Sequence, residues 1–195
     1  MYAIETLVAV YRQALMGTVD TKAHEAKGAF KYIPWDSDRF IRCIHRASDL
    51  LRSGGYHNVS FIDVGCGMGE KSIMASNYFQ KCYGIEMNRI YVQKGLKLIA
   101  AGEGLKDSMS ARPLPKDRVK LILGDARKHD YNRYDCVYFY QPMLDQAKQQ
   151  VLEDRILSTM KVGAVLIHAL KITPPEQMKK QGFLGIDRDI SVKVR

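Results

Sequence analysis

Cysteine is scarce in this sequence, and its spacing does not match a metal site or a disulfide framework. The chain has 195 residues, and its four cysteines, Cys43, Cys66, Cys82 and Cys136, lie far apart with no C-x-x-C pair. The five histidines show no metal-ligand spacing either, so we expect no metal site. These absences argue against a zinc module and a disulfide-stapled secreted domain, and they favour a reducing compartment.

Long apolar runs are also missing. No stretch approaches the roughly 18 apolar residues that a membrane span needs. The N-terminal residues 1–5 show no basic leader before an apolar run. We therefore expect no membrane association and a cytoplasmic location. Because low-complexity tracts and blocks of like charge are absent too, we expect the chain to fold throughout.

Length and charge set the next limits. A chain of this length with 46% hydrophobic residues fits one domain, with N-terminal helices and a loop over residues 1–57 and the core over residues 58–195. The formal net charge of +9 favours an anionic partner such as nucleic acid or an acidic protein surface. Lys and Arg are scattered, however, which favours a basic surface over a dedicated nucleic-acid groove.

The N-terminal part is predicted to be helical. Apolar residues from Ile4 to Leu15 fall on one face of an amphipathic helix that ends near Gly17, and an irregular loop follows over residues 18–35. The Asp36-Ser37 pair predicts a helix cap. A second helix is expected over residues 38–52, ending at Gly54-Gly55.

From residue 58 onward, short apolar runs alternate with helical stretches, which is typical of βαβ units and a mostly parallel buried sheet. Strands are predicted over residues 59–64, 82–85, 119–123, 136–140 and 164–170, and helices over residues 70–79, 88–101 and 144–160. The last helix carries Leu144, Ala147, Val151 and Leu157 near helical spacing. Residues 102–118 are predicted to be a long irregular loop. Two alternating pieces over residues 183–186 and 190–194 predict a short C-terminal antiparallel hairpin.

These elements define an α/β fold class. We expect a doubly wound, mostly parallel sheet with helices on both faces, an N-terminal helical extension and the C-terminal hairpin. In such folds ligands bind beyond the carboxyl ends of the strands.

A glycine-rich turn follows the first predicted strand. The strand carries Asp63, the turn reads Gly65-Cys66-Gly67-Met68-Gly69, and the next helix begins at Glu70. The glycines permit close approach of a ligand, and the amides at the start of the helix favour an anion or carboxylate. A dinucleotide or S-adenosylmethionine would both fit such a turn. The dinucleotide fingerprint requires glycine at position 70, where this chain has Glu70, so a cationic ligand with an amino acid tail suits the turn better, its ammonium facing Asp63.

Two further carboxylates follow the next strands. Glu86 ends the second strand and can accept both ribose hydroxyls, and Asp125 after the third strand can accept from an adenine amine. Taken one at a time, each acid is better explained as a helix cap or a solvated strand end.

As an ordered set, these motifs resemble those of the class I S-adenosylmethionine-dependent methyltransferases. The resemblance covers Asp63 with the glycine turn, Glu86, then Gly124-Asp125-Ala126, then residues 161–164 before the last parallel strand, about residues 58–170 in all. It implies a Rossmann-like fold, S-adenosylmethionine as cofactor, and methyl transfer to an acceptor of unknown class, whether protein, nucleic acid or small molecule. The residues assigned to cofactor binding are Asp63, Gly65, Cys66, Gly67, Gly69, Glu86, Asp125 and Ala126.

The fourth strand ends in Tyr140-Gln141-Pro142, which places an aromatic ring and an amide beside the expected methyl group. Methyl transfer needs mainly positioning of its reactants, so Tyr140 and Gln141 are the candidate catalytic residues. Gln141-Pro142 is only distantly similar to the polar-Pro-Pro-aromatic motif of family members that methylate amines. Tyr138 and Phe139 are equally well explained as core residues.

The loop before the second helix is the other candidate wall of the site. Tyr32 with Trp35 loosely resembles the loop that folds over the cofactor in several methyltransferase groups, so Tyr32 is a further candidate cofactor-binding residue. A hydrophobic staple formed by Trp35 is the alternative.

Two other functions follow from the same pattern. A non-catalytic module of this fold would bind a nucleoside ligand or a partner protein, consistent with the weak acceptor motif. An NAD-dependent oxidoreductase is disfavoured by Glu70. The oligomeric state is left open.

Overall fold

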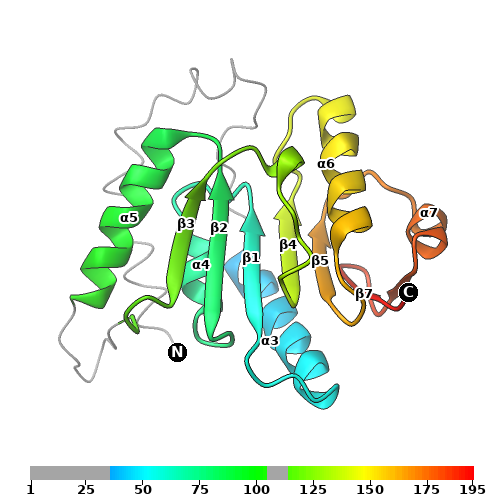
Figure 1. Cartoon of the computed structure of the whole chain (residues 1–195), viewed down its shortest axis with the longest axis horizontal. Coiled ribbons are helices and arrows are strands. Elements are labelled where there is room, and N and C mark those ends of the chain that lie inside the picture. Colours follow the sequence, from blue (N-terminus) through cyan, green and yellow to red (C-terminus); the bar gives the residue numbers. More distant parts are fainter. Residues whose placement is uncertain (1–35, 105–113) are drawn as a thin grey trace.

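A seven-stranded sheet forms the centre of the computed structural model, which describes residues 36–104 and 114–195. Its strands follow the spatial order β3-β2-β1-β4-β5-β7-β6 (Figure 1). β1 to β5 pair in parallel, and β7 is antiparallel to both of its neighbours. The strands are β1 (Ser60–Val64), β2 (Lys81–Glu86), β3 (Val119–Leu123), β4 (Cys136–Tyr140), β5 (Val165–Ala169), β6 (Phe183–Gly185) and β7 (Ile190–Lys193). The α/β fold class, the five parallel strands and the C-terminal hairpin are thus confirmed.

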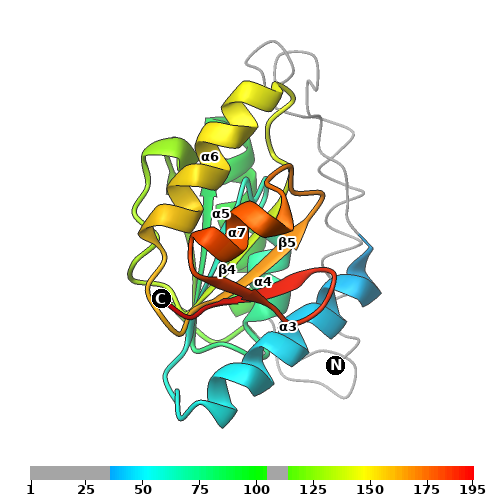
Figure 2. The same cartoon turned by 90° about the vertical axis from the view of Figure 1, so that its right-hand side faces the viewer.

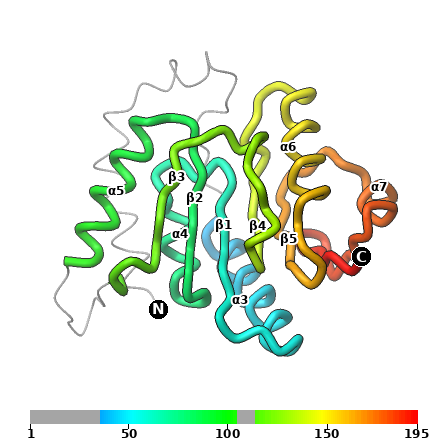
Figure 3. The backbone as a smooth tube through the Cα atoms, in the orientation of Figure 1, coloured from blue at the N-terminus to red at the C-terminus, as the bar shows by residue number. Residues whose placement is uncertain are grey.

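The strand order reverses direction between β1 and β4. The chain runs outward from β1 through β2 to β3, then returns to β4 on the other side of β1 and continues to β5 (Figure 3). The connections leaving the carboxyl ends of β1 and β4 therefore run to opposite faces of the sheet, and ligands of open α/β sheets bind at such a point. Asp63 in β1, Glu86 in β2 and Tyr140 in β4 lie near this edge.

Helices cover both faces of the sheet (Figure 2). One face carries α3 (Ser37–Ser53), α4 (Glu70–Ala75) and α5 (Arg89–Glu103), whose apolar side chains share one buried cluster with alternate residues of the strands. The other face carries α6 (Gln146–Thr159) and α7 (Pro175–Lys180) over a second buried cluster. Since successive residues of a strand point to opposite faces, the apolar runs of β1, β4 and β5 serve both clusters.

Helix α3 begins and ends where the sequence predicts. The Asp36 side chain accepts from the backbone N–H of Asp38 at 2.9 Å, and Gly54 caps the other end. Phe40 of α3 packs edge-on against the rings of Phe61 and Tyr138, with ring centroids 6.3 and 4.9 Å apart. The helix is therefore fixed to the sheet beneath it.

The apolar face predicted for α6 is wrong for Leu144, Ala147 and Val151, which are exposed, and right for Leu157, which is 2% exposed. Leu144, which precedes the helix, and Val151 are 52% and 54% exposed, whereas Leu152 and Ile156 are fully buried. The buried side also includes Glu153, which is 1% exposed. Because a pattern of apolar residues counts buried polar groups as solvated, it assigned the wrong side of this helix to the core.

Glu153 tolerates burial because its carboxylate is well supplied with donors. It accepts from the Gln149 side chain at 2.8 Å, the Ile172 N–H at 2.9 Å, and both the N–H and hydroxyl of Thr173 at 2.8 and 2.5 Å. Gln149 in turn accepts from the Met143 N–H at 3.2 Å. This network ties α6 to the connections that follow β4 and β5.

Other element boundaries also differ from the prediction. α4 ends at Ala75 instead of residue 79, and α5 continues to Glu103 into the predicted loop. α7 was missed because Pro174-Pro175 reads as loop, although proline suits the first turn of a helix. The predicted helix over residues 4–15, the loop over residues 18–35 and residues 105–113 of the predicted loop lie outside the described residues.

None of the helices in the described ranges has the length and apolar character to cross a membrane.

Gly95 of α5 allows the helix to approach the glycine turn. A Cβ at this position would collide with the Met68 carbonyl oxygen and with the Leu121 side chain. We expect Gly95→Ala to lower the free energy of unfolding by about 1–3 kcal/mol, because a backbone atom cannot move aside cheaply. Urea denaturation measures this change. Gly185→Ala is the control, since a Cβ there meets nothing within 4 Å; an equal effect of both variants would contradict the close approach.

Candidate functional site

The turn over residues 65–69 is held in a glycine-dependent conformation. Gly65, Gly67 and Gly69 have φ of +76°, +56° and +82°, in the left-handed region that side chains disfavour. A Cβ on Gly65 would lie 2.5 Å from the Cβ of Pro142, which follows β4. The turn therefore packs directly against the connection that carries the predicted acceptor residues.

The same turn is fastened to the end of β2. The N–H groups of Gly65 and Cys66 both donate to the Ile85 carbonyl, at 2.9 and 3.1 Å. The Gly67 N–H donates to Glu86 Oε2 at 3.0 Å. Gly84 makes room for this contact, because a Cβ there would lie 2.6 Å from the Cys66 sulfur. Burial raises the pKa of the Cys66 thiol, so this side chain acts as an apolar filler in the contact.

Asp63 is a buried carboxylate with one unpartnered oxygen. The residue is 3% exposed, and its Oδ2 atom has no hydrogen-bond partner in the part of the chain that the structure describes. The pKa of Asp63 is raised to about 8, mainly by burial; Lys71 opposes this rise, and the charges of Glu86 and Glu70 add to it. A buried acceptor without a partner is costly, and a cationic ligand at this edge of the sheet would satisfy it.

Glu86 is also buried, but its carboxylate is engaged. Besides the bond from Gly67, Oε1 accepts from the Asn88 N–H at 2.8 Å. Burial raises the pKa of Glu86, against the lowering effect of the Asn88, Gly67 and Met87 amides. Each carboxylate oxygen can accept two hydrogen bonds, so the predicted role toward a ribose is compatible with this arrangement.

Asp125 is engaged differently. It caps the short 3-10 helix η1 (Ala126–Lys128) and pairs with the Arg127 guanidinium through two bonds of 2.9 and 2.8 Å. This hydrogen-bonded pairing lowers the pKa of Asp125. Ala126 is 7% exposed, and its carbonyl accepts from the Tyr131 hydroxyl at 2.8 Å. The adenine-side roles predicted for Asp125 and Ala126 stay predictions.

The connections after β4 and β5 both begin with an unusual backbone. Gln141 has φ of +29° and Leu170 has φ of +55°, although neither is glycine. They directly follow Tyr140 and Ala169, which are partners in the β4–β5 register, so the two positions are neighbours at the sheet edge. Backbone strain of this kind is concentrated at functional sites, and it is consistent with the predicted role of Gln141.

Two aromatic residues of β4 belong to the core, and a third lies at the end of the strand. Tyr138 and Phe139 are 3% and 2% exposed and belong to the two opposite buried clusters, which resolves their earlier ambiguity in favour of the core. Tyr140, the last residue of the strand, is only partly buried against the α3 side of the sheet. Its predicted catalytic role stays a prediction.

The described part of the chain thus brings most of the predicted site to one edge. The glycine turn, Asp63 and Glu86 contact one another or share neighbours, and Pro142 links the turn to Gln141. Tyr32 lies outside the described residues. Within residues 36–104 and 114–195 no group of His, Cys, Asp and Glu side chains has the arrangement of a metal site, and all four cysteines are buried and free.

The Glu153 and Gln149 network was missed by sequence reasoning. The only signal was a Gln and a Glu four residues apart, a spacing that on most helices marks an exposed side-chain pair. Nothing in that spacing reveals that the pair binds the backbone of Met143, after β4, and of Thr173, after β5.

Solved structures show which fold this is. An RNA methyltransferase from Salinibacter ruber, in complex with S-adenosyl-L-homocysteine, superposes with a TM-score of 0.53 at 19% identity, over 82% of this chain and 91% of that one. The glycopeptide N-methyltransferase MtfA, complexed with S-adenosyl-L-methionine, gives a TM-score of 0.47 at 16% identity, over 64% of this chain and 53% of that one.

Sequence comparison finds a shorter similarity. A probable chloroplastic tocopherol O-methyltransferase of Oryza sativa subsp. japonica is 40% identical in an alignment of 71 residues that covers 32% of this chain. The matched part is 19% of that relative, so the chain spans about a fifth of its length. No family model matches the chain. The fold is that of the class I S-adenosylmethionine-dependent methyltransferases, as the motif resemblance predicts.

The unpartnered carboxylate predicts a pH-dependent stability difference. The folded-state pKa of Asp63, about 8, lies above the ordinary value of 3.8, so folding takes up a proton between these pH values. The Asp63 contribution to stability therefore falls as pH rises across that window, by at most about 1.4 kcal/mol per pH unit. We expect Asp63→Asn to remove this loss, so that the variant gains on the wild type between pH 5 and pH 7.5 in urea denaturation.

The control is Asp154→Asn, which changes an exposed carboxylate on α6. A constant stability difference between Asp63→Asn and the wild type at both pH values would show that Asp63 is ionised in the folded protein.

Proposed function

We propose that this protein is an S-adenosylmethionine-dependent methyltransferase. The observation that carries the proposal is the buried Asp63 with its unpartnered Oδ2, beside a turn of three left-handed glycines at the point where the strand order reverses. A sulfonium ligand with an amino acid tail would provide the charged donor that Oδ2 lacks among the described residues. The fold shared with a methyltransferase that holds S-adenosyl-L-homocysteine supports the same cofactor.

The residues present fit this cofactor. Asp63 would accept from the ammonium of the methionine part, and the glycine turn would leave room for that part to lie against the backbone. Glu86, fixed by the Gly67 and Asn88 amides, would accept from the ribose hydroxyls with its remaining lone pairs. Asp125 and Ala126 would border the adenine. Bound S-adenosylmethionine supplies the electrophilic methyl group.

The acceptor side follows from the contact between Gly65 and Pro142. It places the connection after β4 against the turn that would hold the methionine part, so Gln141 would border the transferred methyl group. Gln141 and Tyr140 would orient the acceptor atom by hydrogen bonds, and a tyrosine face would stabilise a sulfonium. The Gln149–Glu153 network keeps this connection and the one after β5 in place. The acceptor is a protein, a nucleic acid or a small molecule; the names of the relatives point to different classes.

Cofactor binding is predicted to depend on pH through Asp63. Below pH 8, pairing with an ammonium requires that the carboxyl lose its proton, so affinity for S-adenosylmethionine should rise up to about tenfold per pH unit from pH 6 to pH 7.5. Isothermal titration calorimetry in buffers of different ionisation enthalpy measures the affinity and the released proton.

We expect Asp63→Asn to bind about tenfold more weakly at pH 7.5, because a charge-assisted hydrogen bond is lost, and to show little pH dependence. Asp154→Asn should behave like the wild type. Identical pH profiles for the wild type and Asp63→Asn would refute this role for Asp63.

Catalysis is predicted to depend on the Gln141 side chain. Gln141→Gly relieves the left-handed backbone but removes the amide, so we expect an unchanged or higher melting temperature together with at least tenfold slower methyl transfer. The assay is transfer of labelled methyl groups from S-adenosylmethionine into fractionated protein, RNA and small-molecule extracts.

Asp117→Gly is the matched control, because Asp117 has φ of +58° just before β3, at the opposite edge of the sheet. It should gain the same backbone relief and keep full activity. Tight cofactor binding without transfer into any extract would instead indicate a non-catalytic binding module.

A further inference from the structure

Within residues 36–104 and 114–195, one face of the sheet has no helix over β2 and β3. The connection from β3 to β4 contains only η1, so among the described residues no helix lies in front of these strands (Figure 1). Tyr83 and Ile122 on this face are only partly buried at the margin of the cluster beneath α6. An exposed sheet face with an aromatic residue and no covering element is uncommon in a folded protein unless it has a partner.

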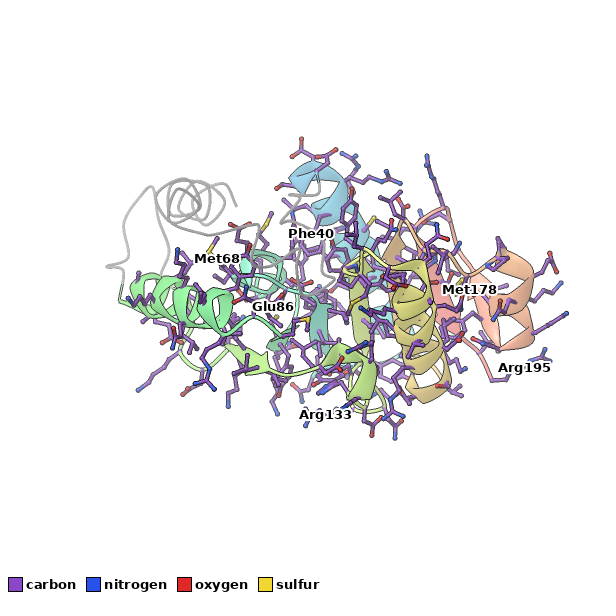
Figure 4. All side chains as sticks on the ribbon, turned by 90° about the horizontal axis from the view of Figure 1, so that it is seen from above. Phe40, Met68, Glu86, Arg133, Met178 and Arg195 are labelled. Atoms are coloured by element: carbon purple, nitrogen blue, oxygen red, sulfur yellow. The ribbon has the colours of Figure 1, made fainter. Side chains whose placement is uncertain are left out.

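Tyr83 packs with two other planar groups, the Tyr134 ring and the Arg133 guanidinium. Its ring meets the Tyr134 ring edge-on at 5.3 Å, and the Arg133 guanidinium lies over both rings, 6.0 Å from the Tyr83 centroid and 5.1 Å from that of Tyr134. Figure 4 shows Arg133 on the side of the sheet away from Phe40, and therefore away from α3. Aromatic rings and guanidinium planes are surfaces on which nucleic-acid bases stack.

Cations surround this assembly. Lys120 is the register partner of Tyr83 on β3, so both side chains project from the same face, and Lys81 lies two residues before Tyr83 on β2. Lys81, Lys120 and Arg133 are exposed, and none of them forms an ion pair with a described residue.

Elsewhere on the molecule several cations are neutralised. Arg39, Arg46, Arg127 and Lys161 each pair with an aspartate. On the face of β2 and β3, three exposed cations without an ion pair to a described residue lie next to a stacking surface. In a duplex the bases are paired and stacked, so they could not stack on Tyr83. An acidic protein could pair with the cations but would have no bases to stack on Tyr83 and Arg133. Cations beside a stacking surface therefore fit the phosphates and unpaired bases of a single strand.

We propose that the face formed by Lys81, Tyr83, Lys120 and Arg133 binds single-stranded RNA. The lysines contact phosphates, and Tyr83 with Arg133 stacks on one or two unpaired bases. RNA is the favoured strand because unpaired loops and ends, whose bases are free to stack, are the usual targets of RNA-binding proteins. This binding is independent of the proposed methyl transfer, and it would add a macromolecular partner whichever acceptor the site edge serves.

The test is fluorescence anisotropy of a labelled 12-nucleotide oligouridylate with the full chain, without cofactor, over a series of salt concentrations. Lys81→Ala with Lys120→Ala should weaken binding about tenfold and reduce the salt slope by roughly 0.7 per cation removed. Tyr83→Leu, which keeps apolar packing against Tyr134, should weaken binding about fivefold or more, and Tyr83→Phe should retain it. Circular dichroism checks that each variant is folded.

The matched control is Lys179→Ala with Lys180→Ala, which removes the same charge from exposed positions on α7. It should bind as the wild type does. The proposal is overturned by an equal loss in this control, by an unchanged Tyr83→Leu, or by equal affinity for an RNA duplex, for polyglutamate or for oligodeoxythymidylate of the same length.

Discussion

The fastening of the glycine turn to the end of β2 is the contact on which the rest of the site depends. The Ile85 carbonyl accepts from two successive amides of the turn, and Glu86 accepts from a third. The turn can take this position because Gly84 leaves room for the Cys66 side chain, and Gly95 leaves room for the Met68 carbonyl oxygen. The site therefore depends on glycines, which leave room for these contacts, as much as on its polar side chains.

This contact also explains why two carboxylates so close together can be buried. Glu86 is stabilised by the amides that it orders, so its negative charge contributes to holding the turn. Asp63 receives no such compensation among the described residues, and the folded chain keeps it protonated near neutral pH. One acid thus serves the architecture, and the other stays available for a ligand.

The sequence predicted the sheet well and the helices less well, for a physical reason. Strands buried on both faces are nearly continuous apolar runs, and β4, which is of this kind, was placed at its observed bounds. The bounds of β3 were also predicted correctly, although this strand is only partly buried. Helix α6 was placed correctly but turned the wrong way, because its buried side includes the polar residues Gln149 and Glu153, whose partners lie far along the chain. Apolar periodicity contains no information about such partners.

The candidate site was also predicted only in part. Asp63, Glu86 and the glycines were found because their positions follow from strand ends, which local pattern determines. The contact of Gly65 with Pro142 and the pairing of Asp125 with Arg127 depend on side-chain placement across connections, so they became visible only in the structure. Tyr32, outside the described residues, remains a prediction from resemblance alone.

The position of β7 has a consequence for how the sheet is completed during folding. β7 lies between β5 and β6, so β6, although it comes first in the chain, has no pairing partner until β7 is in place. Until then the edge of β5 is open to strands of other chains, a hazard that most sheets avoid by covering or charging their edges. Late docking of β7 would therefore lengthen the interval in which partly folded copies can associate wrongly.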